Sequence, residues 1–247
     1  MLIKSKVKYI QSLSQKKLRD EEGVFVAEGP KIVEELLRSP VIVLKELLAT
    51  AEWLGHHAKD HNDITHLITE IDLPSLERIS FQTTPNQVLG IFRKPDFTGP
   101  INFSGKLSLV LDTIQDPGNL GTIIRCADWF GIENVVCSRE CADAFSPKVV
   151  QSSMGSIGRV RIIEEDPVEL LNEHSNIPVY AAALDGVPLE KIGAVEEGFL
   201  IIGNESKGIS DALKQRATKK ITIPRKGGAE SLNAAVATGI ILSHVTK

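Results

Sequence analysis

Three glycine-containing turns carry the polar side chains best suited to chemistry. The turn DPGNLG presents Asn119 and is followed by Arg125, the turn GNESKG presents Glu205, and the turn GGAESLN presents Ser231 and Asn233. An amide, a hydroxyl, a carboxylate and a guanidinium can position a polar substrate and stabilise a developing negative charge. Glycines let the backbone bend closely round a ligand. We therefore expect a polar or anionic ligand where these turns meet.

Each turn taken alone has an ordinary structural explanation. Asn119 could cap the helix that follows it, and Arg125 could form a surface ion pair. The second turn has the glycine spacing of a phosphate loop, but Ile209 stands where that loop needs a lysine. No G-x-G-x-x-G follows a first strand, which disfavours a dinucleotide-binding or class I methyltransferase fold. Close helix packing could explain the small residues after the third turn, which are Ala234, Ala235, Ala237 and Gly239.

The elements around these turns alternate between strand and helix. We predict strands at 106–112, 134–138, 160–164, 178–184, 199–203 and 219–224, and helices at 118–130, 147–154, 167–174, 210–217 and 231–245. Such alternation is typical of a parallel α/β sheet covered by helices on both faces. Ligands bind outside the carboxyl ends of the strands in such sheets, and each of the three turns follows a predicted strand.

The first 95 residues predict a separate, small α/β module. Its expected helices lie at 4–18, at 30–37 and from Leu73 or Pro74, and its strands lie at 25–29, within 41–50, at 65–69 and at 87–94. The segment 93–106 contains two prolines and two glycines without a periodic apolar pattern, which is typical of a linker. We therefore expect domains at 1–95 and 107–247, joined by a linker at 96–106.

Composition limits the class of protein. Of 247 residues, 42% are hydrophobic and 24% are charged, and no apolar run approaches the ~20 residues of a membrane helix. The start of the chain lacks the apolar core of a secretory signal, so we expect a cytoplasmic protein. Cys137 and Cys141 are four residues apart, but no second close pair and no spaced histidine pair accompanies them, so we expect no metal.

Charge is distributed unevenly along the chain. The formal net charge of −4 argues against nonspecific coating of nucleic acid. Two basic clusters nevertheless occur, and either one alone is most simply a solvated surface. The first contains Lys4, Lys6, Lys8, Lys16, Lys17 and Arg19, and the second contains Lys214, Arg216, Lys219, Lys220, Arg225 and Lys226.

The three turns and their flanking residues resemble the motifs of a known enzyme family. DPGNLGTIIRCADWFG, IIGNESKGIS and IPRKGGAESLNAAVATGI are similar, in order and spacing, to the three motifs of the SpoU (TrmH-type) RNA 2′-O-ribose methyltransferases of the SPOUT superfamily. SPKVVQSSMGSIGRV between the first and second motifs fits as well, and together these segments cover most of 107–247. The earlier FVAEGPKIVEELL resembles the start of the small substrate-binding domain, akin to ribosomal protein L30e, that often precedes them.

The resemblance implies a fold and a cofactor that composition cannot show. It implies a C-terminal trefoil knot that holds S-adenosylmethionine, and a homodimer with the active site across its interface. The helix predicted from Ser231 would be the dimer surface. No membrane partner is implied. The cofactor would be held near Gly203, Ile223 and Leu232, with Ala183 and Leu184 near the adenine.

The resemblance also assigns roles to the polar side chains. Asn119, Arg125, Glu205, Ser231 and Asn233 all match functional positions of the family, which argues for an active enzyme. Arginine is a poor base because its pKa lies above ~12. We therefore expect Arg125 to contact the ribose hydroxyl and a phosphate and to stabilise the developing alkoxide, with Glu205 orienting Arg125 or its loop.

Two other functions remain open from sequence. One is a non-catalytic RNA-binding or ribosome-assembly factor that keeps the fold, which the complete set of polar residues disfavours. The other is a SPOUT enzyme that methylates a base. The sequence does not distinguish ribosomal from transfer RNA as the structured RNA substrate.

Overall fold

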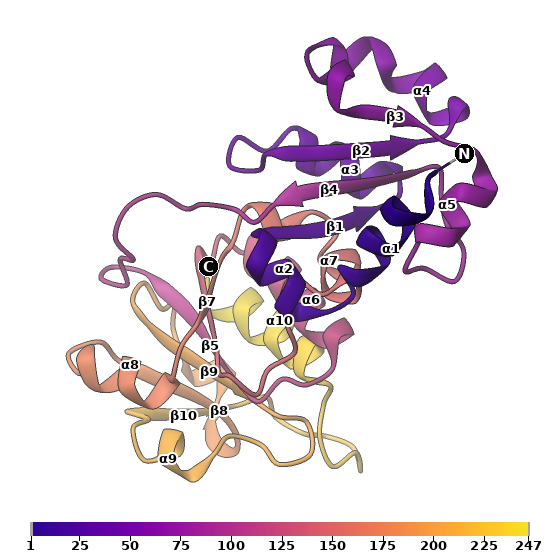
Figure 1. Cartoon of the computed structure of the whole chain (residues 1–247). Helices are drawn as coiled ribbons and strands as arrows, with labels where there is room; N and C mark the ends of the chain where they lie inside the picture. Colours follow the sequence, from indigo (N-terminus) through magenta and orange to yellow (C-terminus); the bar gives the residue numbers. More distant parts are fainter. Residues whose placement is uncertain (1, 247) are drawn as a thin grey trace. The chain divides into compact units, whose positions relative to one another are not determined.

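The chain forms two compact units, each built around its own sheet (Figure 1). The computed structural model describes residues 2–246, apart from the side chains of residues 58–62; Met1 and Lys247, the outer ends of the predicted domains, lie outside it. The first unit contains residues 1–97 and 145–158, and the second contains residues 98–144 and 159–247. Residues 94–106, which include the predicted linker, contain no helix or strand. The helix at Pro147–Ser153 packs within the first unit.

The sheet of the first unit is mixed, with strand order β1-β4-β2-β3. Strand β4 is antiparallel to both β1 and β2, and β3 is parallel to β2. The strands are β1 (Val24–Glu28), β2 (Leu44–Ala49), β3 (Ile68–Glu70) and β4 (Val88–Arg93). The helices are α1 (Lys4–Ser12), α2 (Lys16–Glu22), α3 (Pro30–Leu37), α4 (Ala51–His57), the 3₁₀ helix η1 (Ala58–Leu67), α5 (Leu73–Ile79), α7 (Pro147–Ser153) and the 3₁₀ helix η2 (Ser156–Gly158).

Alternation along β1 explains why helices cover this sheet. Val24 and Val26 join the core formed with α1 and α5, whereas Phe25 between them stacks against Phe92 and packs at a tilt against Phe145. Successive side chains of a strand point to opposite faces. Both faces of β1 are therefore buried, as the fully buried pattern of this strand requires.

Two sequence predictions for this unit were wrong. The helix expected at 4–18 is two helices, because Leu13 caps α1 and Gln15 is extended before α2 begins. Arg19 of α2 is buried and donates a hydrogen bond from Nη1 to the free carbonyl of Leu13, which satisfies the broken helix end. Helix α4 and η1, which separate β2 from β3, were not predicted, because 51–67 lacks a clear apolar period.

The sheet of the second unit has six parallel strands in the order β10-β8-β9-β5-β6-β7. This confirms the α/β fold class. The strands are β5 (Leu107–Asp112), β6 (Asn134–Cys137), β7 (Arg161–Glu164), β8 (Val179–Pro188), β9 (Gly198–Gly203) and β10 (Lys219–Thr222). The helices are α6 (Pro117–Trp129), α8 (Pro167–Glu173), the 3₁₀ helix η3 (Leu189–Lys191), α9 (Asp211–Lys214) and α10 (Ala234–Val245).

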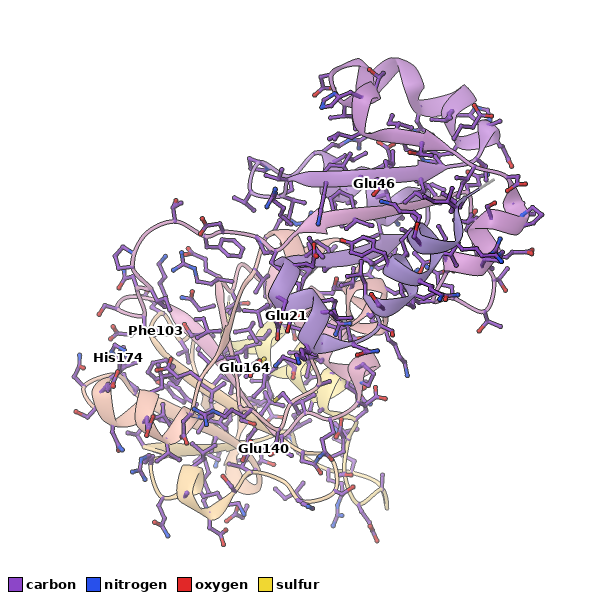
Figure 2. All side chains as sticks on the ribbon, in the orientation of Figure 1. Glu21, Glu46, Phe103, Glu140, Glu164 and His174 are labelled. Atoms are coloured by element: carbon purple, nitrogen blue, oxygen red, sulfur yellow. The ribbon has the colours of Figure 1, made fainter. Side chains whose placement is uncertain are left out.

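Helices bury both faces of this sheet. On one face, α8 and α9 pack over β6, β8 and β9, and Phe103 lies edge-on to His174 with ring centroids 5.0 Å apart (Figure 2). On the other, α10 packs against α6 and β9. None of the helices within residues 2–246 is long and apolar enough to cross a membrane. The turns after β5, β9 and β10 all leave the carboxyl edge of the sheet, where the sequence predicted the site.

Candidate functional site

The first turn starts a helix whose cap is an aspartate. Asp116 is the N-cap of α6, and its Oδ1 accepts a hydrogen bond from the backbone N–H of Asn119 at 2.8 Å. The alternative explanation of Asn119 as the cap is therefore wrong. Because Asp116 satisfies the helix end, the amide side chain of Asn119 is available for other contacts.

The second turn is closed so tightly that only glycine fits its first position. A Cβ on Gly203 would lie 2.4 Å from the carbonyl carbon of Gly208. Asn204 folds back within the turn, where its Oδ1 accepts from the backbone N–H groups of Ser206 at 2.9 Å and Lys207 at 3.1 Å. Its Nδ2 donates to the carbonyl of Thr113 at 2.9 Å, which ties this turn to the end of β5.

The third turn ends at the N-cap of α10. Asn233 occupies this position, and its Oδ1 accepts from the backbone N–H groups of Ala235 at 3.0 Å and Val236 at 3.2 Å. The closing helix thus begins at Ala234 and not at Ser231, as predicted, because Asn233 caps it. Ser231 is exposed in the preceding extended segment.

A directed chain of hydrogen bonds joins all three turns. Asn233 has its oxygen fixed by the helix, so its Nδ2 is the donor to Oδ1 of Asn119, at 2.8 Å. Nδ2 of Asn119 then donates to Oε1 of Glu205. Since a carboxylate only accepts, the orientation of each amide is determined. The structure thus brings together Asn119, Glu205 and Asn233.

Arg125 does not join this chain. Six residues separate it from Asn119 on α6, which places it about 9 Å along the helix and about 120° around it. Its side chain is exposed and forms no hydrogen bond or ion pair with any residue that the structure describes. The alternative explanation of Arg125 as a surface ion pair is therefore wrong. Thr122 and Trp129 are exposed on the same face of α6.

The residues expected to hold the cofactor lie along the same edge of the sheet. Ala183 and Leu184 belong to a segment where β8 leaves β10, because Ala181 pairs with Lys220 but Val187 pairs with the next residue. The carbonyl of Leu184 accepts from Thr222 Oγ1 at 3.3 Å, at the end of β10. Ile223 follows this strand directly, and Leu232 precedes α10.

Exposure and free backbone groups make these segments suitable for S-adenosylmethionine. Leu184 is 74% exposed and Leu232 is 45% exposed, so both offer apolar surface to an adenine ring. No backbone–backbone hydrogen bond joins residues 225–232 to another residue within 2–246, although the carbonyl of Ala229 accepts from Arg225 Nη1 at 3.3 Å. Free N–H and C=O groups need partners, and the edge of an adenine supplies both donors and acceptors. The residues present therefore fit this cofactor.

Two residues behind the turns were missed as positioning groups. Asp112 is 7% exposed, and its Oδ2 accepts from the backbone N–H of Ser210 at 2.6 Å. Its Oδ1 accepts from Thr113 Oγ1 at 3.1 Å, and Thr113 has a φ of +60°, an uncommon conformation for a β-branched residue. These contacts hold the ends of β5 and β9 in fixed spacing. A carboxylate ending a strand that leads into a glycine turn is the signal that could have identified Asp112.

The cysteines lie near the first turn but do not form a metal site. Cys141 Sγ accepts from the backbone N–H of Ile114 at 3.3 Å. A hydrogen bond with Cys137 lowers the pKa of Cys141 to about 7 and, together with burial, raises the pKa of Cys137 well above its usual value. Burial also raises the pKa of Cys126, against the opposing charge of Arg125. No group of three or more metal-ligating side chains occurs in the described part of the chain.

Each basic cluster contains some cations that form ion pairs and some that form none with the described residues. In the first, Lys6 forms an ion pair with Glu46 of β2 (Figure 2), and Arg19 is buried. Lys17 forms an ion pair with Glu21 one turn later. Lys4 and Lys8 form no ion pair with any residue that the structure describes, so this cluster is only partly neutralised.

The second cluster has cations without ion pairs beside the third turn. Lys214 and Lys220 form ion pairs with aspartates. Lys219, Arg225 and Lys226 form none with any residue that the structure describes, and Arg225 and Lys226 adjoin the third turn. These cations therefore remain available to an anionic ligand.

Comparison with known proteins gives the family directly. The SpoU rRNA Methylase family matches residues 106–243, and the MRM3-like substrate binding domain matches residues 4–90. The chain is 35% identical over 243 residues, covering 97% of this chain and 95% of the relative, to the 23S rRNA (guanosine(2553)-2′-O)-methyltransferase RlmP of Bacillus subtilis.

Solved structures agree over the whole chain. An AdoMet-bound rRNA methyltransferase of Sinorhizobium meliloti superposes with a TM-score of 0.85 at 32% identity, covering 99% of this chain and 95% of that one. A TrmH-family protein of Porphyromonas gingivalis gives a TM-score of 0.85 at 38% identity, covering 99% and 98%. The chain therefore belongs to the SpoU rRNA methylase family, the S-adenosylmethionine-dependent RNA 2′-O-ribose methyltransferases that the sequence predicted.

Proposed function

We propose that the chain methylates a ribose 2′-hydroxyl of ribosomal RNA in the site where its three turns meet. The hydrogen-bonded chain Asn233–Asn119–Glu205 is the observation that carries the proposal, because it links one polar residue from each motif. The similarity to RlmP of Bacillus subtilis, whose name specifies a guanosine of 23S rRNA, supports a 23S substrate.

Each polar residue has a defined task in this reaction. S-adenosylmethionine supplies an electrophilic methyl group when bound. Asn119, Asn233 and Ser231 position the ribose, and Arg125 contacts its 2′-oxygen and a neighbouring phosphate, where the guanidinium offsets the charge that develops on oxygen. Backbone groups near Gly203, Ile223 and Leu232 hold the cofactor, with Ala183 and Leu184 beside its adenine.

Arg125 would enter the site from a second copy of the chain. Within one chain, Arg125 faces away from Asn119, as described above. Its face of α6 continues to Trp129, which is 82% exposed, and the adjoining α10 exposes Val236 and Ile240. A large exposed aromatic beside exposed aliphatic residues is typical of an interaction surface. A homodimer through α6 and α10 would bury these residues and bring Arg125 of one protomer to the partner's turns.

Mixing two inactive variants tests the shared site. Arg125→Ala and Glu205→Gln are each expected to be inactive, and refolding them together as heterodimers should restore activity. One site of each heterodimer then contains an intact arginine and an intact glutamate from different chains. Restoration by Arg125→Ala mixed with Arg125→Lys would contradict complementation, and a monomeric protein in analytical ultracentrifugation would contradict the dimer.

Two finer features of the family also belong to this proposal. Strand β10 lies beyond β8 at the sheet edge, yet α10 packs against α6 and β9, so residues 223–233 must cross the carboxyl ends of the sheet. This path supports a trefoil knot around the cofactor. An rRNA substrate supports a cytoplasmic location. An experimental structure whose backbone would pull out into a straight, unknotted chain would contradict the knot.

Comparison of ribose-methylation maps tests the reaction and the substrate together. Ribosomal RNA from cells that lack the gene should lose one 2′-O-methylated nucleotide, and the purified protein with labelled S-adenosylmethionine should restore it. Digestion of the product to nucleosides should place the label on ribose. Label on a base, or cofactor-dependent RNA binding without transfer, would contradict the proposal.

A further inference from the structure

The hydrogen-bonded chain through the three turns ends on an acceptor with one oxygen unused. Oε1 of Glu205 accepts from Asn119. Oε2 accepts no hydrogen bond from any other residue within the described range, and the side chain is half-buried. The carboxylate is thus held at one oxygen and open at the other.

Methyl transfer to a hydroxyl needs a group that receives its proton. We propose that Glu205 is this group and takes the 2′-hydroxyl proton on Oε2; this inference rests on the proposed function. The proton passes to Oε2 as the ribose O2′–C bond forms and the S–C bond of the donor breaks. The positive charge of the sulfonium is lost and the carboxylate becomes a neutral carboxyl, so charge and atoms balance.

The other charged groups at these turns are less suited to the task. Arg125 is a guanidinium, which has only donors and no atom that accepts a proton. Asp116 caps α6, and Asp112 is buried with both oxygens bonded. Glu230, before α10, is exposed and contacts none of the three chain residues.

The chain of amides explains how Glu205 is held for this role. Its direction runs from the helix N–H groups of α10 through Asn233 and Asn119, so the two amides cannot rotate to present an acceptor to Glu205. A positioned carboxylate contributes ~10²–10⁴-fold to a rate that depends on proton transfer. The remaining charged groups on the elements that meet here are Arg125 and Asp128 on α6, Lys207 on the second turn, and Arg225 and Lys226 beside the third turn.

A pH profile of the single-turnover rate distinguishes a proton acceptor from a structural role. The substrate is ribosomal RNA from cells that lack the gene, with S-adenosylmethionine in excess. The wild-type rate should fall towards acid, because a neutral carboxyl cannot accept the hydroxyl proton. Glu205→Gln still accepts a hydrogen bond from Asn119, and its rate should be about 100-fold or more below that of the wild type. It should also lose the acid limb, which is the fall in rate towards low pH. Its affinity for the cofactor, measured by calorimetry, should stay within about threefold of the wild-type affinity. Glu230→Gln is the matched control and should keep the wild-type profile.

Two further variants keep the test decisive if the glutamine disturbs the turn. Glu205→Asp should retain part of the rate and the acid limb, and Glu205→Ala should recover rate on addition of acetate, which supplies a carboxylate to the gap. A Glu205→Gln rate within about threefold of wild type, an unchanged acid limb, or no recovery with acetate would overturn the assignment. An inactive wild-type protein in the same assay would instead overturn the proposed function.

Discussion

The first unit and the second unit use polar side chains in opposite ways. In the first, Lys6 pairs with Glu46, and Lys45 pairs with Glu22 beside Tyr9, so charges near α1 and α2 are consumed within the unit. In the second, the three turns link uncharged amides into one chain and leave a carboxylate oxygen, Arg125 and the cations of the third turn free.

The comparison shows that pairing, and not residue type, distinguishes structural charges from functional ones. The basic cluster at the start of the sequence has more lysines than the second cluster. Its members Lys6, Lys17 and Arg19 nevertheless contact other residues of the first unit. An exposed guanidinium without a protein partner is solvated by water, so it does not destabilise the fold and remains available to bind a ligand. The predictions below test this contrast, starting with the largest expected effect.

Replacement of the free guanidinium should have the largest effect. Arg125→Lys keeps the charge but loses the planar fork that contacts an oxygen and a phosphate together. We expect the methyl-transfer rate to fall by about 10²–10³-fold with no change in melting temperature, since Arg125 has no partner to lose. Arg38→Lys, at an exposed arginine that pairs with the buried Glu34 of the first unit, is the matched control and should leave the methyl-transfer rate unchanged. Wild-type turnover by Arg125→Lys would remove the proposed role.

Forcing the second turn open should weaken cofactor binding. Gly203→Ala places a methyl group against the backbone of Gly208 and forces the turn open. We expect a loss of about tenfold or more in S-adenosylmethionine affinity, equivalent to about 1.4 kcal/mol, by calorimetry. Gly193→Ala is the control, because its Cβ would meet nothing within 4 Å. Equal affinities for the two variants would argue that the turn does not shape the cofactor site.

Salt dependence should separate the two basic clusters. Replacing Arg225 and Lys226 with alanine removes two unpaired cations beside the third turn, so the slope of log affinity for RNA against log salt should decrease by about 1.4–1.8. Replacing Lys6 and Lys17, which are already paired, should change the slope little. Filter binding at several salt concentrations measures both. A larger change in slope for the replacement of Lys6 and Lys17 would show that the first cluster, and not the second, contacts RNA.

The smallest effect is expected from the ion pairs of the first unit. Lys6→Ala leaves Glu46 without its partner, in a pair that is partly exposed on both sides. We expect a decrease of at most about 1 kcal/mol in the free energy of unfolding, measured with urea, and an unchanged methyl-transfer rate. A variant that unfolds normally but methylates slowly would place Lys6 in the RNA surface after all.

The sequence alone predicted the architecture of the second unit well. Apolar strands alternate there with capped helices, so the strands from β5 to β10 and the positions of the three turns at one edge followed from pattern. The first unit was harder, since α4 and η1 lack a clear period and α1 ends at Leu13, whose carbonyl accepts a hydrogen bond from the buried guanidinium of Arg19 on α2. The pattern of apolar residues does not show such a side-chain contact.

The candidate site was predictable in its residues but not in its connections. Asn119, Glu205 and Asn233 are polar residues in glycine turns, which a sequence displays. Which of them touch depends on the strand order, and only the order places β5 beside β9. The partners of Asp112 and Asn204 could not be predicted for the same reason: each side chain bonds a backbone atom more than 90 residues away, and no local pattern identifies that atom.

A double-mutant cycle on the methyl-transfer rate tests most directly whether the turns act as one unit. Asn119→Ala and Asn233→Ala each break the chain that connects α10 to Glu205. If the chain works as a unit, the double variant should be no slower than the slower single variant, because residues in one network are not additive. Effects that multiply would show that the two amides act independently, and the account of a single connected site would be wrong.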